Sequence, residues 1–192
     1  MLAWVASALA GALVIGGVTI YSWLSTPQVE ACCQFGGGGG GTKVDVGWRA
    51  VYYASSSDAW VDETIVNMGR TTVTLTGGRT HASDSSHQLP RLDVGFGPYV
   101  NPKPTLDLPT LAPPTPETMT GRVTLQPGDM VWMVVEIRLP KGCIMPLVDG
   151  GKQEYVAYDI NAVVVSAQAL RRTSDIDVPL FEGLGYRLRP SC

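Results

Sequence analysis

The sequence of 192 residues is long enough for one domain of ordinary size and a short accessory segment. Its charged fraction of 16% is low, and no charged side chain precedes Glu30. The formal net charge of −3 gives no electrostatic footprint for nucleic acid, and it predicts no basic patch for anionic lipid.

The chain opens with an apolar run of 23 residues, Leu2 to Leu24. As a helix, this run would extend about 34 Å, enough to cross a hydrocarbon core of about 30 Å. Trp4 and Trp23 suit the two interfaces of a bilayer, and Pro27 stops a helix just beyond them. We therefore expect residues 2–24 to form one transmembrane helix whose partner is the lipid bilayer.

Processing of this segment is an open alternative. No Lys or Arg precedes the run, and it exceeds the apolar region of about 7–15 residues in a signal peptide. The tripeptide before Cys32, Val29-Glu30-Ala31, nevertheless offers small residues for cleavage and faintly resembles a lipobox. An uncleaved anchor is the favoured interpretation.

One face of the expected helix carries small residues at intervals of four: Ala8, Ala12 and Gly16. Such a stripe lets two helix backbones approach closely, so it indicates a homodimer contact in the membrane. Small residues are also common in membrane helices that do not associate.

Residues 25–43 have no hydrophobic periodicity and contain six consecutive glycines, Gly36 to Gly41. This composition predicts a flexible tether between the membrane and the domain that follows. Cys32 and Cys33 lie within this tether. Three alternatives are open for them: an interchain disulfide, lipidation, or a pair of inert thiols.

Residues 44–192 change to a period of two, which predicts β-strands. Frequent turn signals such as Gln126-Pro127-Gly128-Asp129 separate the strands, and no amphipathic helix is indicated. The expected strands are 46–53, 59–68, 71–75, 92–96, 121–125, 130–139, 155–166 and 176–180. This pattern predicts an all-β domain, an antiparallel two-layer β-sandwich with its own core.

The expected core is the set of inward-facing apolar positions on these strands. It comprises Trp48, Ala50, Tyr52, Val61, Ile65, Val73, Leu75, Val123, Leu125, Val131, Met133, Val135, Ile137, Val156, Tyr158, Ile160 and Val164.

The order of turns and strands resembles a family. An Asn67-x-Gly69 turn leads into Val73-Thr74-Leu75-Thr76-Gly77, Leu125-x-Pro127-Gly128 follows, and Cys143 and the terminal Cys192 come last. This order is similar to that of a loose group of uncharacterised, membrane-anchored extracytoplasmic proteins of actinobacteria with an immunoglobulin-like domain. The resemblance covers residues 46–192 and implies a fold and a location but no activity. The Cys-Trp-Cys pattern of antibody domains is not reproduced.

Few residues suggest chemistry. His81 and His87 flank Asp84 in one polar loop, and together they would offer a metal two imidazoles and a carboxylate. Their spacing matches no defined metal motif, so we expect no metal, no other cofactor and no catalytic residue. A metal-binding or enzymatic domain that uses the His81–His87 loop is the alternative.

Two acidic pairs and a proline-rich segment have structural interpretations. Asp62 and Glu63 are adjacent in a strand and point to opposite faces. Asp175 and Asp177 share a face, where solvated charge is expected. Residues 98–117 contain half of the fourteen prolines and predict an extended surface loop, with a peptide ligand for a partner as the alternative.

Cysteine pairing cannot be derived from sequence, because four cysteines allow three connectivities. Cys143 and Cys192 lie at strand ends away from the tether, so we expect a disulfide between them, with unpaired thiols as the alternative. Such a bond favours an oxidising compartment and places the N-terminus in the cytoplasm and the domain outside. The expected function is a non-enzymatic binding or structural module of the cell envelope that has an unidentified protein partner.

Overall fold

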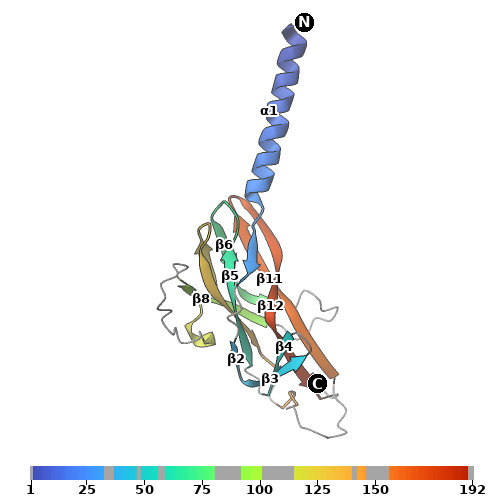
Figure 1. Cartoon of the computed structure of the whole chain (residues 1–192), viewed down its shortest axis with the longest axis vertical. Helices are drawn as coiled ribbons and strands as arrows, with labels where there is room; N and C mark the ends of the chain where they lie inside the picture. Colours follow the sequence, from blue (N-terminus) through green and yellow to red (C-terminus); the bar gives the residue numbers. More distant parts are fainter. Residues whose placement is uncertain are drawn as a thin grey trace.

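The computed structural model describes residues 2–32, 37–46, 49–55, 59–80, 92–100, 115–139, 142–145 and 156–189. It consists of one N-terminal helix and a β domain built from two sheets (Figure 1). The all-β expectation for the domain is confirmed at this level. The helix extends from one end of the domain, which we call the apical end.

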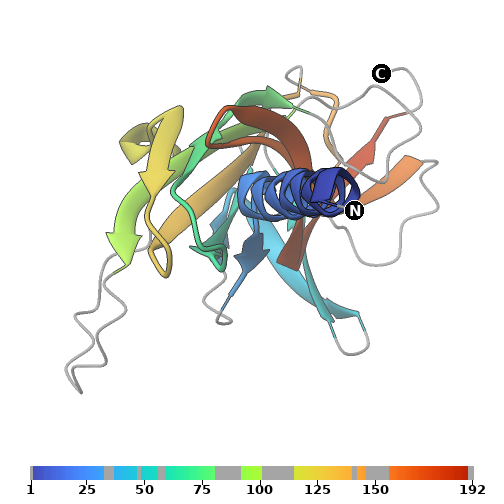
Figure 2. The ribbon, with the colours of Figure 1, turned by 90° about the horizontal axis from the view of Figure 1, so that it is seen from above.

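Helix α1 spans Leu2–Ser25 without interruption. The helix ends before Pro27, because a proline cannot continue a helix. Pro27 itself is buried where the chain turns into the first strand. Viewed from above, α1 projects over the strands of the domain (Figure 2). In the described part of the chain, no helix satisfies the combined criteria of length and apolarity for a membrane span.

Within the described residues, each sheet has six strands. The first has the order β1-β5-β10-β8-β7, with β2 also paired to β5; its strands are β1 (Val29–Ala31), β2 (Gly37–Gly39), β5 (Trp60–Asn67), β7 (Gly78–Thr80), β8 (Leu92–Val100) and β10 (Met130–Ile137). The second has the order β3-β4-β12-β11-β6-β9; its strands are β3 (Gly41–Val46), β4 (Arg49–Ala54), β6 (Val73–Thr76), β9 (Arg122–Leu125), β11 (Val156–Ala169) and β12 (Arg172–Leu188). A 3-10 turn, η1 (Pro116–Thr118), precedes β9.

The apolar faces of the two sheets form one core. The expected core positions that are buried are Val61, Ile65, Val73, Leu75, Val123, Leu125, Val131, Met133, Val135, Ile137 and Ile160. The strands β5, β10, β6 and β9 supply most of them, since their side chains alternate inward with a period of two. The prediction for Trp48 lies outside the described residues.

The expected core position Val164 is wrong by one residue. Val163 and Val165 are buried in its place. Ile160, earlier in the same strand, is also buried, so the inward face changes from even-numbered to odd-numbered residues after it. The pairing of β11 with β12 shifts between Ile160 and Ala162. A bulge of this kind changes which alternate residues face inward, and a period-two count cannot anticipate it.

The prediction of a flexible tether over residues 25–43 is wrong for its described part. Strands β1 and β2 both pair with β5, and β3 pairs with β4, so this segment belongs to both sheets. The glycines are needed for close packing: a Cβ on Gly39 would lie 2.5 Å from the Trp60 indole nitrogen. A Cβ on Gly41 would lie 2.4 Å from the Tyr53 carbonyl oxygen. The β domain therefore begins before residue 44.

Two further expectations need refinement. The sandwich is not wholly antiparallel, because β4 pairs with β12 in parallel over Gly183 to Gly185. Strand β12 is 17 residues long, whereas the sequence predicted a strand only over 176–180. The proline-rich segment 98–117 lies outside the described residues except for its ends at 98–100 and 115–117.

Candidate functional site

The junction between α1 and the domain is built from several specific contacts. The Thr71 hydroxyl donates a hydrogen bond to the Leu24 carbonyl oxygen at 2.9 Å. The Arg70 guanidinium lies 4.7 Å from the centroid of a Trp23 ring. The Met68 amide donates to the Gln28 carbonyl oxygen at 2.9 Å. The last turn of α1 is therefore fixed to the turn between β5 and β6.

Asn67 organises the apical turns. Its side-chain amide donates to the carbonyl oxygens of Thr71 and Leu125, at 2.9 and 3.0 Å, and its Oδ1 accepts from the Gly69 amide at 2.9 Å. The backbone groups of Asn67 also bond to Gly128 and Asp129 in the turn between β9 and β10. This fully buried residue thus joins two turns that are far apart in sequence.

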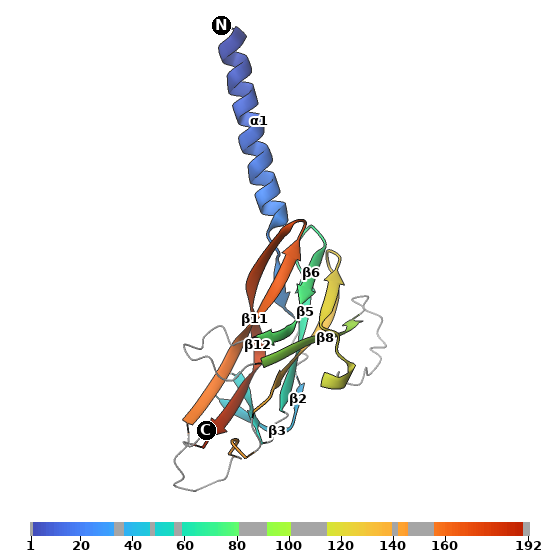
Figure 3. The same ribbon diagram turned by 180° about the vertical axis from the view of Figure 1, so that it is seen from behind.

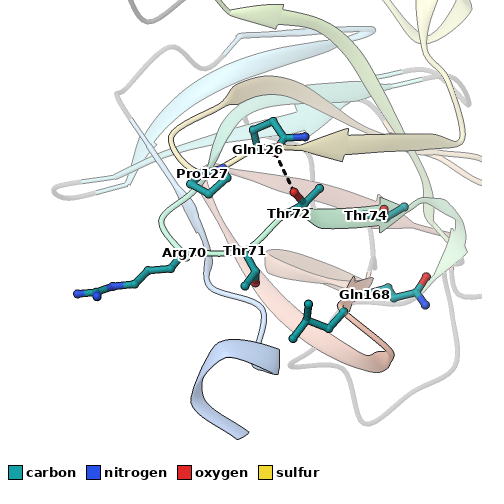
Figure 4. A pocket seen from close by; sticks show the side chains of 8 residues that line it. Arg70, Thr71, Thr72, Thr74, Gln126, Pro127 and Gln168 are labelled. Atoms are coloured by element: carbon teal, nitrogen blue, oxygen red, sulfur yellow. Dashed lines mark hydrogen bonds between the residues drawn. The ribbon is translucent and has the colours of Figure 1, made fainter. Parts of the chain in front are cut away.

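A cavity of about 630 Å³ opens at the apical end beside these turns (Figure 4). Its lining mixes uncharged polar residues with one arginine and two apolar residues: Arg70, Thr71, Thr72, Thr74, Gln126, Pro127, Gln168 and Leu170. The Thr72 hydroxyl donates to the Gln126 side-chain oxygen at 2.8 Å, so the Gln126 amide nitrogen is not used in that bond. Figure 4 shows the Arg70 side chain directed outward, away from the threonines.

Three arginines gather at this end although the sequence separates them widely. Val73 pairs with Ala169, so Arg70 before β6 and Arg171 in the β11–β12 turn lie at the same end of the second sheet. Arg172 follows at the start of β12, and all three side chains are exposed. The expectation that the chain has no basic patch is therefore wrong at this end of the fold.

A second candidate site is a buried carboxyl group between the two sheets. Glu63 on β5 is 1% exposed, and its Oε2 accepts the Phe181 amide of β12 at 2.5 Å. Phe181 lies in the part of β12 that has no partner in β11, because the ladder passes from Leu184 directly to Pro179. The carboxylate therefore satisfies an amide that the bulge leaves without a ladder partner.

Burial raises the pKa of Glu63 to about 7. The amides of Phe181 and Thr64 favour the charged form, while the nearby Asp62 and Glu182 carboxylates oppose it. Glu182 is itself 4% exposed and forms an ion pair with the Lys43 ammonium group. The hydrogen bond to Glu182 in turn raises the pKa of Lys43. The cluster contains a carboxyl group that changes charge near neutral pH.

A third candidate site is a smaller cavity of about 160 Å³ beside β8 and β10. In this cavity the Arg138 Nε lies 3.1 Å from the Asp93 Oδ2, and the Arg138 Nη2 lies 2.8 Å from the Glu136 Oε2. Arg138 is already paired with both carboxylates of this cavity, so the cavity is a weaker candidate than the apical end.

The sequence-predicted site residues are not brought together by the described structure. His81 and His87 lie outside the described residues. Asp175 and Asp177 are exposed on one face of β12, and the described residues contain no group of three or more His, Cys, Asp or Glu that could hold a metal ion. Both described cysteines, Cys32 and Cys143, are disulfide-bonded, while Cys33 and Cys192 lie outside the described residues.

Sequence reasoning missed Glu182 and the three arginines. The available signal for Glu63 was its position between Val61 and Ile65 on the inward face of β5, but its partner Phe181 comes from a strand more than a hundred residues later. The apical cavity had no signal, because threonine and glutamine are ordinary surface residues of strands.

Comparison of the chain with protein-family models, with curated proteins and with solved structures found no match. The resemblance to membrane-anchored immunoglobulin-like proteins therefore stays a prediction from the sequence.

Proposed function

We propose that the chain is a single-pass membrane protein whose β-sandwich is a non-enzymatic binding or structural module outside the cytoplasm. The observation that carries this proposal is the exposed apolar surface of α1. Val14, Ile15, Val18, Ile20, Tyr21 and Trp23 are each between 51% and 69% exposed. A continuous apolar surface of this kind favours a partner that removes it from water, and a bilayer is such a partner.

The sequence of the helix supports the same proposal. The run from Leu2 to Leu24 has no charged residue, and Trp23 at its end suits the interface between hydrocarbon and water. The stripe of Ala8, Ala12 and Gly16 lies on one face of this helix, and homodimerisation through it remains a prediction.

The junction at Arg70, Thr71 and Met68 supports a structural role for the module. Because α1 continues into β1, which is paired to β5, the sandwich is held directly on the helix end. A module joined in this way presents its distal end, where β12 finishes at Leu188, away from the membrane (Figure 1). We infer that a partner in the cell envelope binds that distal end or the strand faces. The immunoglobulin-like character of the sandwich belongs to this proposal and is supported by its two layers.

The bonded state of Cys32 and Cys143 supports the outside location, because disulfides persist in oxidising compartments. In this topology the N-terminus is cytoplasmic. A disulfide-bonded Cys32 is unavailable for lipidation, so a disulfide is the favoured state of Cys32.

Peptide mapping tests the pairing between Cys143 and Cys192. The Arg189 amide donates to the Cys143 carbonyl oxygen at 3.0 Å. Arg189 is therefore next to Cys143 in space, and Cys192 comes three residues after Arg189 in the sequence. Mass spectrometry of a non-reduced digest is expected to show one peptide that joins these two cysteines. A digest in which Cys192 is free, or joined to Cys32 or Cys33, would contradict the pairing and weaken the argument for an outside location.

Carbonate extraction tests the membrane anchor. The full chain is expected to stay in the membrane pellet. A double substitution in α1, Val14→Lys with Ile15→Lys, is expected to release most of the protein, since each central lysine costs about 3 kcal/mol of insertion free energy. The matched control places two lysines on exposed strand positions, Thr76→Lys with Thr173→Lys, and should stay in the pellet. A wild-type chain found in the supernatant, or a soluble form that starts at Cys32, would disprove the anchor.

A further inference from the structure

The apical end of the sandwich carries three cations and two apolar side chains around one polar cavity. Arg70, Arg171 and Arg172 are exposed there, and the large side chains Met68 and Leu170 are 57% and 50% exposed. The β11–β12 hairpin turn, which contains Leu170 and Arg171, lies beside the end of α1 (Figure 3). We propose that this apical surface docks onto the anionic phospholipid headgroups of the membrane that α1 enters. This inference rests on the proposed membrane anchor.

The contact between Arg70 and Trp23 indicates the depth of this surface relative to the membrane. A tryptophan at the end of a membrane helix lies among the headgroups, where its apolar ring and polar edge are both accommodated. The Arg70 guanidinium, 4.7 Å from a Trp23 ring centroid, therefore lies at the same depth. The hydrogen bond from Thr71 to Leu24 keeps the rim of the cavity within one turn of the helix end.

Charge and shape favour anionic lipid as the occupant. None of the three arginines forms an ion pair with a described carboxylate, although the whole chain has a net charge of −3. The one described acid in the neighbouring turn, Asp129, uses its Oδ2 to accept the Gln126 amide at 2.7 Å. Arginine recognises phosphate through several N–H donors, and the threonines and glutamines of the cavity suit the phosphate and glycerol oxygens of a headgroup.

Leu170 and Met68 are placed to enter the headgroup layer beside these cations. Leu170 has a φ of 53°, a left-handed conformation that is unfavourable for a leucine, at the tip of the hairpin. An apolar residue at the tip of a turn gains free energy when it is transferred from water to the interface. Cations flanked by exposed apolar side chains are the combination that holds a peripheral surface against an anionic membrane.

The test uses the full chain reconstituted in lipid nanodiscs, one set of phosphatidylcholine alone and one set with phosphatidylglycerol added. Hydrogen exchange of the backbone amides is measured at residues 68–71 and 170–172. We expect exchange in these turns to be slower in the phosphatidylglycerol discs, and no such difference at residues 142–145 near the distal end. A double substitution, Arg171→Gln with Arg172→Gln, should weaken docking about 30-fold, since each cation near an anionic surface contributes about fivefold.

The matched control, Arg122→Gln with Arg189→Gln, removes the same charge from exposed positions away from the apical turns and should behave like the wild-type chain. Co-elution with the discs reports the membrane anchor separately. A chain that enters discs of both compositions, with equal exchange at the apical turns, would overturn the docking surface alone. A chain that enters neither would overturn the proposed anchor and this inference together. Equal effects of the two double substitutions would show non-specific charge attraction and also overturn the docking surface.

Discussion

Replacing Asn67 with alanine (Asn67→Ala) is expected to lower the free energy of unfolding by about 3 to 4 kcal/mol. The substitution removes three side-chain hydrogen bonds, two to the carbonyl oxygens of Thr71 and Leu125 and one from the Gly69 amide. Asn67 is fully buried, so water cannot replace all of these partners without opening the apical turns. Buried polar groups left without partners account for most of the expected loss.

Chemical unfolding of the full chain in detergent micelles, followed by tryptophan fluorescence, measures this loss. Thr74→Ala is the control, because its exposed hydroxyl makes a hydrogen bond only across the surface to Thr124 at 3.2 Å. We expect that control to change the stability by less than about 0.5 kcal/mol. Asn67→Asp keeps the acceptor for Gly69 but places a carboxylate against two carbonyl oxygens, so it should be at least as destabilising at neutral pH. A loss below about 1 kcal/mol for Asn67→Ala would contradict the role assigned to this residue.

The parts of the fold that follow from local alternation were predictable. Strands β6 and β9 alternate with a period of two, and the inward positions predicted on them and on β5 and β10 are buried as expected. The turn at Gln126 to Asp129 was also predictable, since Gly128 has a φ of 83° and the Asp129 amide donates to the Gln126 carbonyl oxygen. In contrast, the inward face of β11 after Ile160 depends on a bulge that is created by pairing with β12.

The glycine-rich segment shows how one composition is compatible with two physical states. A run of glycines is typical of a flexible linker, because glycine restricts the backbone least. The same lack of a side chain allows a strand to pack closely against its neighbours, as at Gly39 beside the Trp60 indole. Which state occurs depends on the neighbouring strands β4 and β5, which lie outside residues 25–43, so the composition of this segment alone does not decide it.

The candidate sites were not predictable for a related reason. Arg70 and Arg171 are 101 residues apart, and the pairing of β6 with β11 brings them to one end of the sheet. Glu63 and Glu182 come from different sheets, and their proximity depends on the bulge in β12. The sequence therefore predicted the layers and many core positions, whereas charge clusters that depend on tertiary pairing needed the structure.

The stability of the domain is expected to fall as the pH rises from about 4.5 to about 7 because of Glu63. Its pKa is about 7 in the folded chain, compared with an ordinary value of 4.5. The folded state therefore binds the Glu63 proton more tightly than the unfolded state does. The contribution of protonated Glu63 to the free energy of unfolding is fully present below pH 4.5, and it is lost as the pH rises through about 7. Its size is about 3 kcal/mol, from about 1.4 kcal/mol for each pH unit between the two values.

Comparison with Glu63→Gln isolates this contribution, because glutamine does not titrate. The free energy of unfolding is measured between pH 4 and pH 8 for both chains, and the difference between them is expected to change by about 3 kcal/mol across that range. At pH 4 Glu63 is protonated, but its hydroxyl oxygen can still accept a hydrogen bond, whereas the NH₂ group of glutamine can only donate; the variant should therefore be less stable than the wild type at pH 4. The exposed Asp175→Asn control should follow the wild-type profile. If the difference between wild type and Glu63→Gln is independent of pH, Glu63 does not titrate near neutrality and the buried carboxyl cluster is not a pH-sensitive element.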